Sequence, residues 1–443
     1  MSLSVKWLQD KVLLRVIRNT GYLFSSQGIS MVLSTLQGIL AALLLGPASY
    51  GALGVVILFA SSVNRLLSFR MGEVVVKYAG QALALGQRER AAAVIKVAGM
   101  TEAITSVTAY GLLVLFSPLA AVYLFKDPAA ASWIIVYGLA LLANLMTETA
   151  SAVLQIGDHF RIQALINFFA SALTAGLILL AFIFHGDIGV VLMAYLLGKL
   201  VSGIGPMLAA YGKLKHMLGE NWLSAPLGLL QDRSAIARFA ISTNLSGTIN
   251  LVIRDSEVLW VGFFLSTLQA GYFKFALAVM NIILMPINPF IATTFPEISR
   301  TVAEKKWDVL QTLLRRTAWI AFAWTMSAVA GLVLLGQPFL SWLKSGAYLP
   351  SYPAILILVA GYGFANVFFW NRPLMLAFGK PNFPLLVTFL VGIVKTVLMF
   401  ILVPRFGFLA QAWLLSGYFI LSVGIIVWRC QREINRAKRG GGL

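Results

Sequence analysis

Charged residues are scarce in this chain. Asp, Glu, Lys and Arg make up 11% of its 443 residues, against about 25% in ordinary soluble proteins. Hydrophobic residues make up 59%. This balance excludes an ordinary soluble globular fold and indicates an all-α protein that crosses the membrane several times.

Cysteine and histidine are also nearly absent. The single cysteine, Cys430, excludes a disulfide framework. The three histidines, His159, His185 and His216, lie far apart without the spacing of metal ligands, so no metal site is expected. No small-residue cleavage site follows the basic N-terminus, so a cleavable signal peptide is not expected.

The motifs of ATP hydrolysis and of common hydrolases are missing too. None of the three Gly-Lys pairs, which begin at Gly198, Gly212 and Gly379, has the glycine spacing of a P-loop or a following Ser or Thr. No Ser/His/Asp arrangement is visible. We therefore expect a protein that is not an enzyme and has no cofactor. If it is a transporter, transport is either coupled to Na⁺ or H⁺ or driven by the gradient of the substrate itself.

Long apolar windows are the main feature that the chain does contain. Windows of about 20 residues, separated by Gly, Pro or charge, predict about 12 transmembrane helices. These windows begin near Tyr22, Gly51, Ala93, Ser132, Ile162, Gly189, Ala237, Ala270, Leu313, Tyr352, Phe383 and Gly407.

Basic residues are distributed asymmetrically about these windows. Most of the 34 Lys and Arg residues fall at the termini or in loops on the same side, whereas Lys126, Lys344 and Arg405 fall in opposite loops. The positive-inside rule then predicts a multi-pass protein of the inner (plasma) membrane with both termini in the cytoplasm. Orientation and contact with anionic membrane lipid explain the formal charge of +18, so no nucleic acid partner is expected.

The two halves of the chain resemble each other. Tyr50-Gly51 lies at the start of the second window and Gly271-Tyr272 at the start of the eighth, and an amphipathic segment follows each window. This similarity predicts two pseudo-symmetric six-helix lobes around a central cavity, and chance likeness between helical hairpins is the alternative. The predicted boundaries are an N-lobe at 1–211, a cytoplasmic linker at 212–236 and a C-lobe at 237–443.

A polar stripe marks the segment from 243 to 257. If the segment is one regular helix, Thr243, Ser246, Asn250, Arg254 and Glu257 share one face. Hydrocarbon cannot solvate a guanidinium or a carboxylate, so this face is expected to line a water-filled cavity. The alternative is that Arg254 and Glu257, one turn apart, neutralise each other and hold helices together.

Similar stripes occur in the first, second and eighth windows. Any one stripe can reflect helix packing, but four stripes at equivalent positions in the two halves favour a common cavity. The polar residues expected to line this cavity are Gln27, Ser30, Ser34, Gln37, Ser61, Ser68, Asn250, Lys274, Asn281 and Asn288.

Basic residues within the windows favour an anionic ligand. Guanidinium groups bind phosphate oxygens bidentately, which makes Arg65 and Arg254 the expected anion-binding residues, with Arg70 at the cytoplasmic end of the second window. Other lysines can instead extend toward the membrane interface, namely Lys96, Lys274 and Lys395.

Three acidic residues are candidates for coupling transport to an ion. They are Glu148, Asp255 and Glu257, each of which lies in a predicted transmembrane window. A salt bridge to a neighbouring helix is the alternative role for each of them.

Several motifs are similar to those of one membrane protein family. They are the segment 45–51 (LGPASYG), Lys77-Tyr78, Asp255, Gly271-Tyr272 and the segment 295–300 (FPEISR). With them, essentially the whole chain resembles the polysaccharide transporter (O-antigen flippase) family of the multidrug/oligosaccharidyl-lipid/polysaccharide (MOP) flippase superfamily.

The resemblance implies a function as well as a fold. It implies a flippase that moves an undecaprenyl-diphosphate-linked oligosaccharide, an O-antigen or related surface polysaccharide unit, from the cytoplasmic to the outer leaflet by alternating access. With such a substrate, the positions of Arg65, Arg254 and Arg70 in this sequence predict that they bind the diphosphate, although Arg70 and Arg254 are less usual for the family. A polysaccharide polymerase or a glycosyltransferase would be a partner protein.

Two other functions stay open. A cation-coupled multidrug exporter of the same superfamily would need an acidic, aromatic-lined cavity. A membrane-embedded glycan polymerase or ligase would need a long outward loop with carboxylates or histidines, and the acidic residues and histidines of the outward loops are Asp127, His185 and Asp187. Twelve helices, in place of fourteen, disfavour the lipid II flippase subtype.

Overall fold

Helices make up most of the described chain. The computed structural model describes residues 11–68, 71–220, 222–230, 234, 236–237, 244, 248 and 251–440, and these residues contain no strand. The side chains of residues 11–27, 227, 288–293, 296 and 439–440 also lie outside the description. The prediction of an all-α fold is therefore confirmed.

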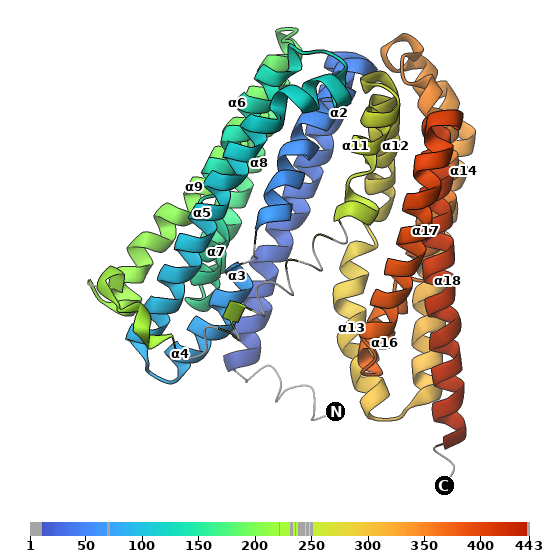
Figure 1. Ribbon diagram of the computed structural model, residues 1–443. Coiled ribbons are helices and arrows are strands. Elements are labelled where there is room, and N and C mark those ends of the chain that lie inside the picture. Colours follow the sequence, from blue (N-terminus) through green and yellow to red (C-terminus); the bar gives the residue numbers. More distant parts are fainter. Residues whose placement is uncertain are drawn as a thin grey trace. The chain divides into compact units, whose positions relative to one another are not determined.

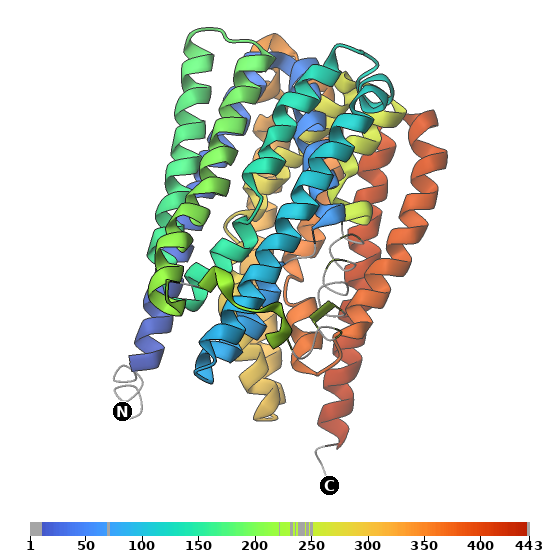
Figure 2. The same cartoon turned by 60° about the vertical axis from the view of Figure 1, so that its left-hand side comes forward.

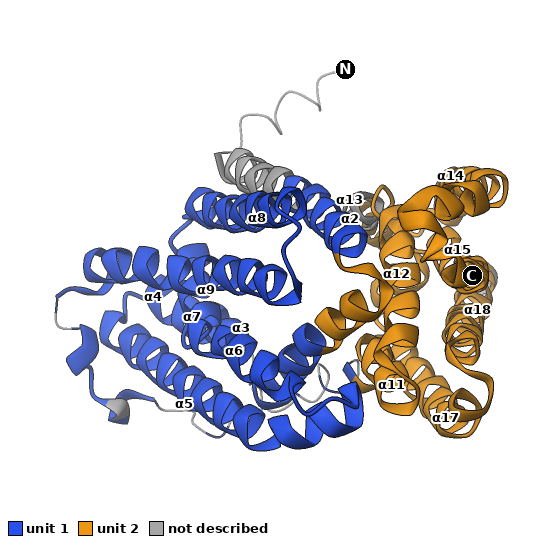
Figure 3. Ribbon diagram, turned by 90° about the horizontal axis from the view of Figure 1, so that it is seen from above, with its two compact units in different colours: residues 1–44, 56–251 blue, residues 45–55, 252–443 orange. Residues whose placement is uncertain are grey.

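The chain divides into two compact units, which Figure 3 colours separately. Unit 1 comprises residues 1–44 and 56–251, and unit 2 comprises residues 45–55 and 252–443. The predicted lobe boundaries at 211 and 237 stay a prediction, and the short segment 45–55 belongs to unit 2 although it comes early in the sequence.

Unit 1 contains the helices of the first half of the chain. Helices α8 and α9 lie side by side in Figures 1 and 2, and α9 begins where Asp187 caps it by accepting a hydrogen bond from the Val190 backbone N–H (3.0 Å). The elements are most of α2 (Lys11–Leu67), α3 (Met71–Val74), the π-turn η1 (Val75–Ala79), α4 (Gly80–Ala84), α5 (Arg88–Ala120), the π-turn η2 (Ala121–Phe125), α6 (Ala130–Ala143), α7 (Thr147–Ile156), α8 (Phe160–Ile183), α9 (Ile188–Leu218) and the short turns η3 (Trp222–Ser224) and η4 (Leu227–Leu229).

Unit 2 contains the helices of the second half. Helix α12 begins after Ser266, whose hydroxyl accepts a hydrogen bond from the Gln269 backbone N–H (3.3 Å). The elements are the π-turn η5 (Leu251–Asp255), α11 (Glu257–Phe264), α12 (Thr267–Leu284), α13 (Asn288–Ala303), α14 (Trp307–Trp342), the short turns η6 (Leu343–Gly346) and η7 (Leu349–Ser351), α15 (Tyr352–Val367), α16 (Asn371–Ala377), α17 (Asn382–Phe406) and α18 (Phe408–Gly440).

Helix α2 is too long to cross a membrane once. Its 57 residues correspond to about 85 Å of α-helix, whereas the hydrocarbon core is about 30 Å thick. The backbone leaves helical geometry at Gly46 (φ 74°, ψ 172°), which Pro47 follows. Positive φ suits glycine, and proline lacks the N–H that would continue the helix. The kink therefore separates the first and second predicted windows.

Ten helical stretches among the described residues are long and apolar enough to cross a membrane. One of them, Gly28–Ala84, contains the second predicted window and most of the first, which begins near Tyr22. The seventh predicted window, near Ala237, lies mostly outside the described residues. The prediction of a polytopic membrane protein is confirmed.

Large apolar side chains cover much of the outer surface of the helices. Leu208, Leu334, Phe184 and Trp342 are among the exposed ones. An extensive apolar exterior of this kind is typical of a surface in contact with lipid. The charged residues that are nevertheless buried inside the units are therefore the unusual feature.

Candidate functional site

In unit 1, a buried carboxylate holds the start of α7. Helix α6 ends at Ala143 and α7 begins at Thr147, and the N-cap residue Met146 offers no side-chain acceptor. Instead, Glu102 of α5, which is only 6% exposed, accepts hydrogen bonds from the backbone N–H groups of Glu148 (2.7 Å) and Thr149 (3.0 Å). The first N–H groups of a helix have no partner within it, and an anion is stabilised there. Glu102 is thus a cap supplied by another helix.

The same helix start brings together two of the predicted site residues. The Ser68 hydroxyl donates a hydrogen bond to the Glu148 carboxylate (3.3 Å). Gly72 permits this approach, because a Cβ there would lie 3.1 Å from the Glu148 carbonyl oxygen. Glu148 is exposed, in contrast to the neighbouring Glu102.

Arg65 lies close to this polar cluster. It occupies the last turn of the helical stretch that ends at Leu67, where a cation is favoured by the helix dipole. Asn244 donates to the Ser68 carbonyl and, at 3.5 Å, to the Arg65 carbonyl.

In unit 2, the π-turn η5 breaks the regular helix predicted for the segment 243–257. A π-turn has more residues per turn than an α-helix, so residues three apart no longer share a face. Arg254 forms an ion pair with Asp255 (3.2 Å) and half of its side chain is exposed, whereas Glu257 is 2% exposed. The prediction that Arg254 and Glu257 share one face is therefore wrong, and so is the alternative that they neutralise each other.

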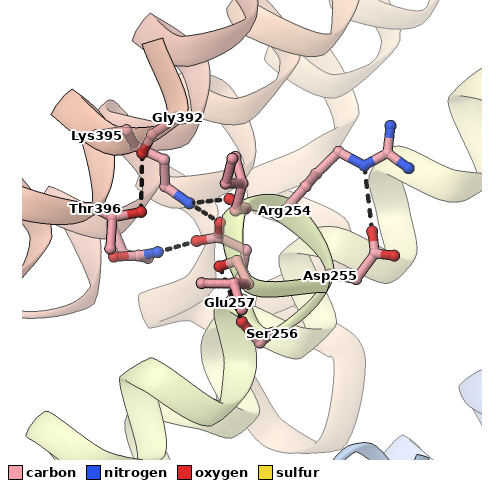
Figure 4. Close-up of polar contacts among 10 residues, drawn as sticks. Arg254, Asp255, Ser256, Glu257, Gly392, Lys395 and Thr396 are labelled. Atoms are coloured by element: carbon pink, nitrogen blue, oxygen red, sulfur yellow. Dashed lines mark hydrogen bonds and ion pairs between the residues drawn. The ribbon is translucent and has the colours of Figure 1, made fainter. Parts of the chain in front are cut away.

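Glu257 is instead neutralised by Lys395 of α17. Their charged groups form an ion pair, and the Lys395 ammonium also donates to the Ile253 carbonyl (2.6 Å). Gln411 of α18 donates its amide N–H to the other carboxylate oxygen of Glu257. Lys395 is 4% exposed and Gln411 is fully buried. These contacts are drawn in Figure 4, and we call Glu257, Lys395 and Gln411 the buried triad.

Lys274 also has partners inside unit 2. Its ammonium donates to the Tyr50 carbonyl (3.1 Å) and lies 3.8 Å from the centre of the Tyr50 ring. The backbones of segment 45–55 and α12 are in close contact here. A Cβ at Gly51 would lie 1.9 Å from the Thr267 carbonyl oxygen, and a Cβ at Gly271 would lie 1.9 Å from the Pro47 carbonyl oxygen. The expectation that Lys274 and Lys395 extend toward an interface is therefore wrong for both.

The other predicted cavity residues have varied surroundings. Gln37 is buried and donates to the Ser171 carbonyl of α8 (2.9 Å), a helix-packing contact. The buried Ser30 hydroxyl has no hydrogen-bond partner among the described residues. Ser34 and Asn281 are exposed and Ser61 is half-buried. Four predicted residues lie outside the described backbone or side chains, namely Gln27, Arg70, Asn250 and Asn288.

The sequence prediction did not select Glu102 and Gln411, which have structural roles in these clusters, and it gave Lys395 a different role. Glu102 and Lys395 each lie in a predicted membrane window, and a charge at such a position is itself a signal of a buried partner. Among the described residues, no group of three or more His, Cys, Asp or Glu side chains is arranged to hold a metal ion.

The fold is similar to that of several solved transporters. The inward-facing conformation of a multidrug resistance MATE family transporter of the MOP superfamily has a TM-score of 0.70 at 15% identity, covering 93% of this chain and 96% of that one. Lipid II flippase MurJ, in an inward closed conformation, has a TM-score of 0.67 at 12% identity, covering 94% and 89%. A MOP superfamily transporter from Pyrococcus furiosus has a TM-score of 0.62 at 14% identity, covering 95% and 96%. At these identities the likeness shows the fold alone.

The sequence matches a relative and a family. Inner membrane protein YghQ of Escherichia coli (strain K12) is 22% identical over 352 residues, which cover 79% of this chain and 98% of that protein. The model of a family described as polysaccharide biosynthesis protein matches residues 16–302, which is more than half of the chain. The resemblance inferred from the sequence motifs is thereby confirmed: this chain belongs to the polysaccharide biosynthesis protein family and has the fold of MOP superfamily transporters.

Proposed function

We propose that the protein is a flippase for an undecaprenyl-diphosphate-linked oligosaccharide, such as an O-antigen unit. It would move this lipid from the cytoplasmic to the outer leaflet by alternating access. The family match over residues 16–302 is the observation that carries the proposal, because the fold alone is shared with multidrug exporters.

The head group of such a lipid carries two phosphates, which need cationic partners at membrane depth. Arg65 and Arg254 are both exposed on their units, so each can reach a ligand. Guanidinium groups bind phosphate oxygens in a bidentate manner, and compensating the charge lowers a barrier of several kcal/mol or more. Arg70, which lies outside the described residues, is the third proposed diphosphate ligand.

Ion coupling is assigned to carboxylates in this proposal. The candidates for Na⁺ or H⁺ are Glu148, which is exposed and accepts from Ser68, and Asp255, which is half-buried and paired with Arg254. Glu257 can bind a cation only after the Lys395 ammonium leaves it, since the two are paired in the structure. An inside-negative potential would also assist an outward-moving anion, by about 2.3 kcal/mol per uncompensated charge per 100 mV.

The proposed location is the inner membrane, with both termini in the cytoplasm. The apolar helices and the relative named as an inner membrane protein support this location, and the distribution of basic residues supports the orientation. Glycosyltransferases that build the substrate and a polymerase that consumes it are the expected partners.

Lipid binding tests the diphosphate assignment. Native mass spectrometry of the purified protein with undecaprenyl diphosphate, and separately with undecaprenol, should show preferential binding of the diphosphate. Arg65→Gln and Arg254→Gln should each weaken that preference, whereas Arg316→Gln, at an exposed position of α14, should not. Equal binding of both lipids by the wild type would refute the assignment.

A further inference from the structure

The π-turn η5 directs neighbouring side chains to opposite sides. Ile253, Ser256 and Glu257 are buried in unit 2, whereas the Arg254 side chain between them is 50% exposed. In a regular helix, Arg254 and Glu257 would be neighbours on one face. The wide turn therefore separates the exposed guanidinium from the buried carboxylate.

Helix α17 contacts this turn at two positions one helical turn apart. At the first position, Gly392 leaves room for the Ile253 side chain, because a Cβ there would lie 2.5 Å from Ile253 Cδ1. At the second, the Lys395 ammonium donates to the Ile253 carbonyl and pairs with the Glu257 carboxylate. Lys395 thus bridges the two ends of the segment that contains Arg254 and Asp255, as Figure 4 shows.

Helix α18 supplies the third residue of the buried triad. Gln411 of α18 donates to Glu257, so the carboxylate has a partner on each oxygen. The Ser256 hydroxyl donates back to the Val252 carbonyl (3.2 Å), which gives the residue before Glu257 its own contact within the turn. The buried side of the turn is therefore fixed by contacts from α17 and α18, and Arg254 and Asp255 project away from them.

We propose that Lys395 is a positioning residue for anion recognition by Arg254. By holding the Ile253 carbonyl and the Glu257 carboxylate together, Lys395 fixes the π-turn and so sets the direction in which the guanidinium projects. This inference rests on the proposed function, since the ligand of Arg254 is taken to be the lipid diphosphate.

If the buried triad only stabilised the fold, apolar residues could take its place. Buried ion pairs can often be replaced by apolar side chains of similar volume without loss of stability, and an apolar pair would not hold the Ile253 carbonyl. A π-turn inside a helix is itself commonly found at functional sites. The backbone position of Arg254 is therefore the property that the triad specifically supplies, while the Asp255 carboxylate contacts the guanidinium itself (3.2 Å).

The test uses the full-length protein in lipid nanodiscs and the double variant Lys395→Met with Glu257→Gln. This variant removes both charges together, so no unpaired charge is left inside the protein. Thr396→Val is the matched control, because the Thr396 hydroxyl donates to the Gly392 carbonyl of its own helix (2.8 Å) and to no other residue that the structure describes. Variants are compared at equal thermal stability, and Lys395→Arg, which keeps the charge and the donors, serves as the rescue variant.

The first readout needs no ligand. A cysteine is introduced by Arg254→Cys in a Cys430→Ser background, and its rate of reaction with a charged methanethiosulfonate reagent is measured. The rate should change about tenfold in the double variant and stay unchanged in Thr396→Val, since a changed turn alters the accessibility of position 254. The rate at Asn382→Cys, an exposed position at the start of α17, should be the same in all variants.

The second readout is the dissociation constant for undecaprenyl diphosphate. The double variant should bind it about tenfold more weakly or worse, the loss expected when a charge-assisted contact is misaligned, with Lys395→Arg closer to the wild type. Wild-type labelling rates and wild-type affinity in a folded double variant would overturn the inference. A changed labelling rate, with no binding of undecaprenyl diphosphate by the wild type, would support the positioning role and refute the proposed function instead.

Discussion

The two units each use a buried charge to hold an irregular helix segment, but they use it in different ways. In unit 1, Glu102 accepts two backbone N–H groups at the start of α7, and its charge is stabilised by the helix terminus. In unit 2, Lys395 and Glu257 neutralise each other next to a π-turn. The arrangement in unit 1 depends on the Glu102 carboxylate as a hydrogen-bond acceptor, and the arrangement in unit 2 depends on the ion pair between Lys395 and Glu257. The two should therefore respond differently when charges are removed.

Breaking the pair in unit 2 should have the largest effect. Lys395→Met leaves the Glu257 carboxylate buried without its opposite charge, which is expected to cost about 3–5 kcal/mol of unfolding free energy. Combining it with Glu257→Gln should recover most of that loss. Thermal unfolding of the purified variants in detergent measures both. Equal losses in the single and double variants would contradict the mutual neutralisation.

Removing the acceptor in unit 1 should have the next largest effect. Glu102→Ala leaves two helix-terminal N–H groups without a partner, which is expected to cost about 1–3 kcal/mol. Glu102→Gln should cost less, because its amide oxygen still accepts one hydrogen bond. The same unfolding measurement applies. A loss as large in Glu102→Gln as in Glu102→Ala would contradict the role of Glu102 as a hydrogen-bond acceptor.

Two buried glutamines sharpen the comparison. Gln411 donates to a charged carboxylate, so Gln411→Leu is expected to cost about 1.5–3 kcal/mol. Gln37 donates to the neutral Ser171 carbonyl, so Gln37→Leu is expected to cost about 0.5–1.5 kcal/mol. Denaturation midpoints of the two variants should preserve this order, and the reverse order would contradict the assigned charge state of the triad.

The smallest expected effect concerns a titrating group between two helices of unit 1. Burial, and then the Lys213 ammonium, lower the pKa of His159 below its ordinary value of 6.5, against the opposing effect of Asp158. The folded protein binds this proton less readily than the unfolded chain. The contribution of neutral His159 to the free energy of unfolding is therefore fully present above about pH 6.5. It is lost as the pH falls through the pKa of His159 in the folded protein, which is the lower of the two.

His159→Gln should accordingly reduce the drop in melting temperature between about pH 7 and about pH 5. The melting temperature of the wild type and of the variant, measured across this range, checks the sign. A drop that is larger in the variant would mean that the folded state favours protonated His159.

Much of the helical framework was predictable from the apolar windows. Windows expected near Tyr352, Phe383 and Gly407 correspond to α15, α17 and α18, which begin at Tyr352, Asn382 and Phe408. Local signals suffice for these boundaries because Gly, Pro and polar residues interrupt the apolar sequence at each of them.

The polar clusters were less predictable because they depend on contacts between distant residues. Lys395 and Glu257 are 138 positions apart, and nothing local to either residue names the other. The π-turn at Leu251–Asp255 adds a further difficulty, since the pattern of three and four residues holds only for a regular helix. Ser68 and Glu148 were both selected as polar residues within windows, but their contact was not foreseen.

Transport of a labelled substrate tests the central proposal most directly. The protein would be reconstituted in vesicles with a fluorescent undecaprenyl-diphosphate-linked oligosaccharide, and the transfer of label between leaflets would be followed by quenching from one side. Wild-type protein should accelerate the transfer, and Arg65→Gln with Arg254→Gln should reduce it toward the rate of empty vesicles while Arg316→Gln leaves it unchanged. Transfer at the wild-type rate by the double arginine variant, or no acceleration by the wild type, would contradict the account.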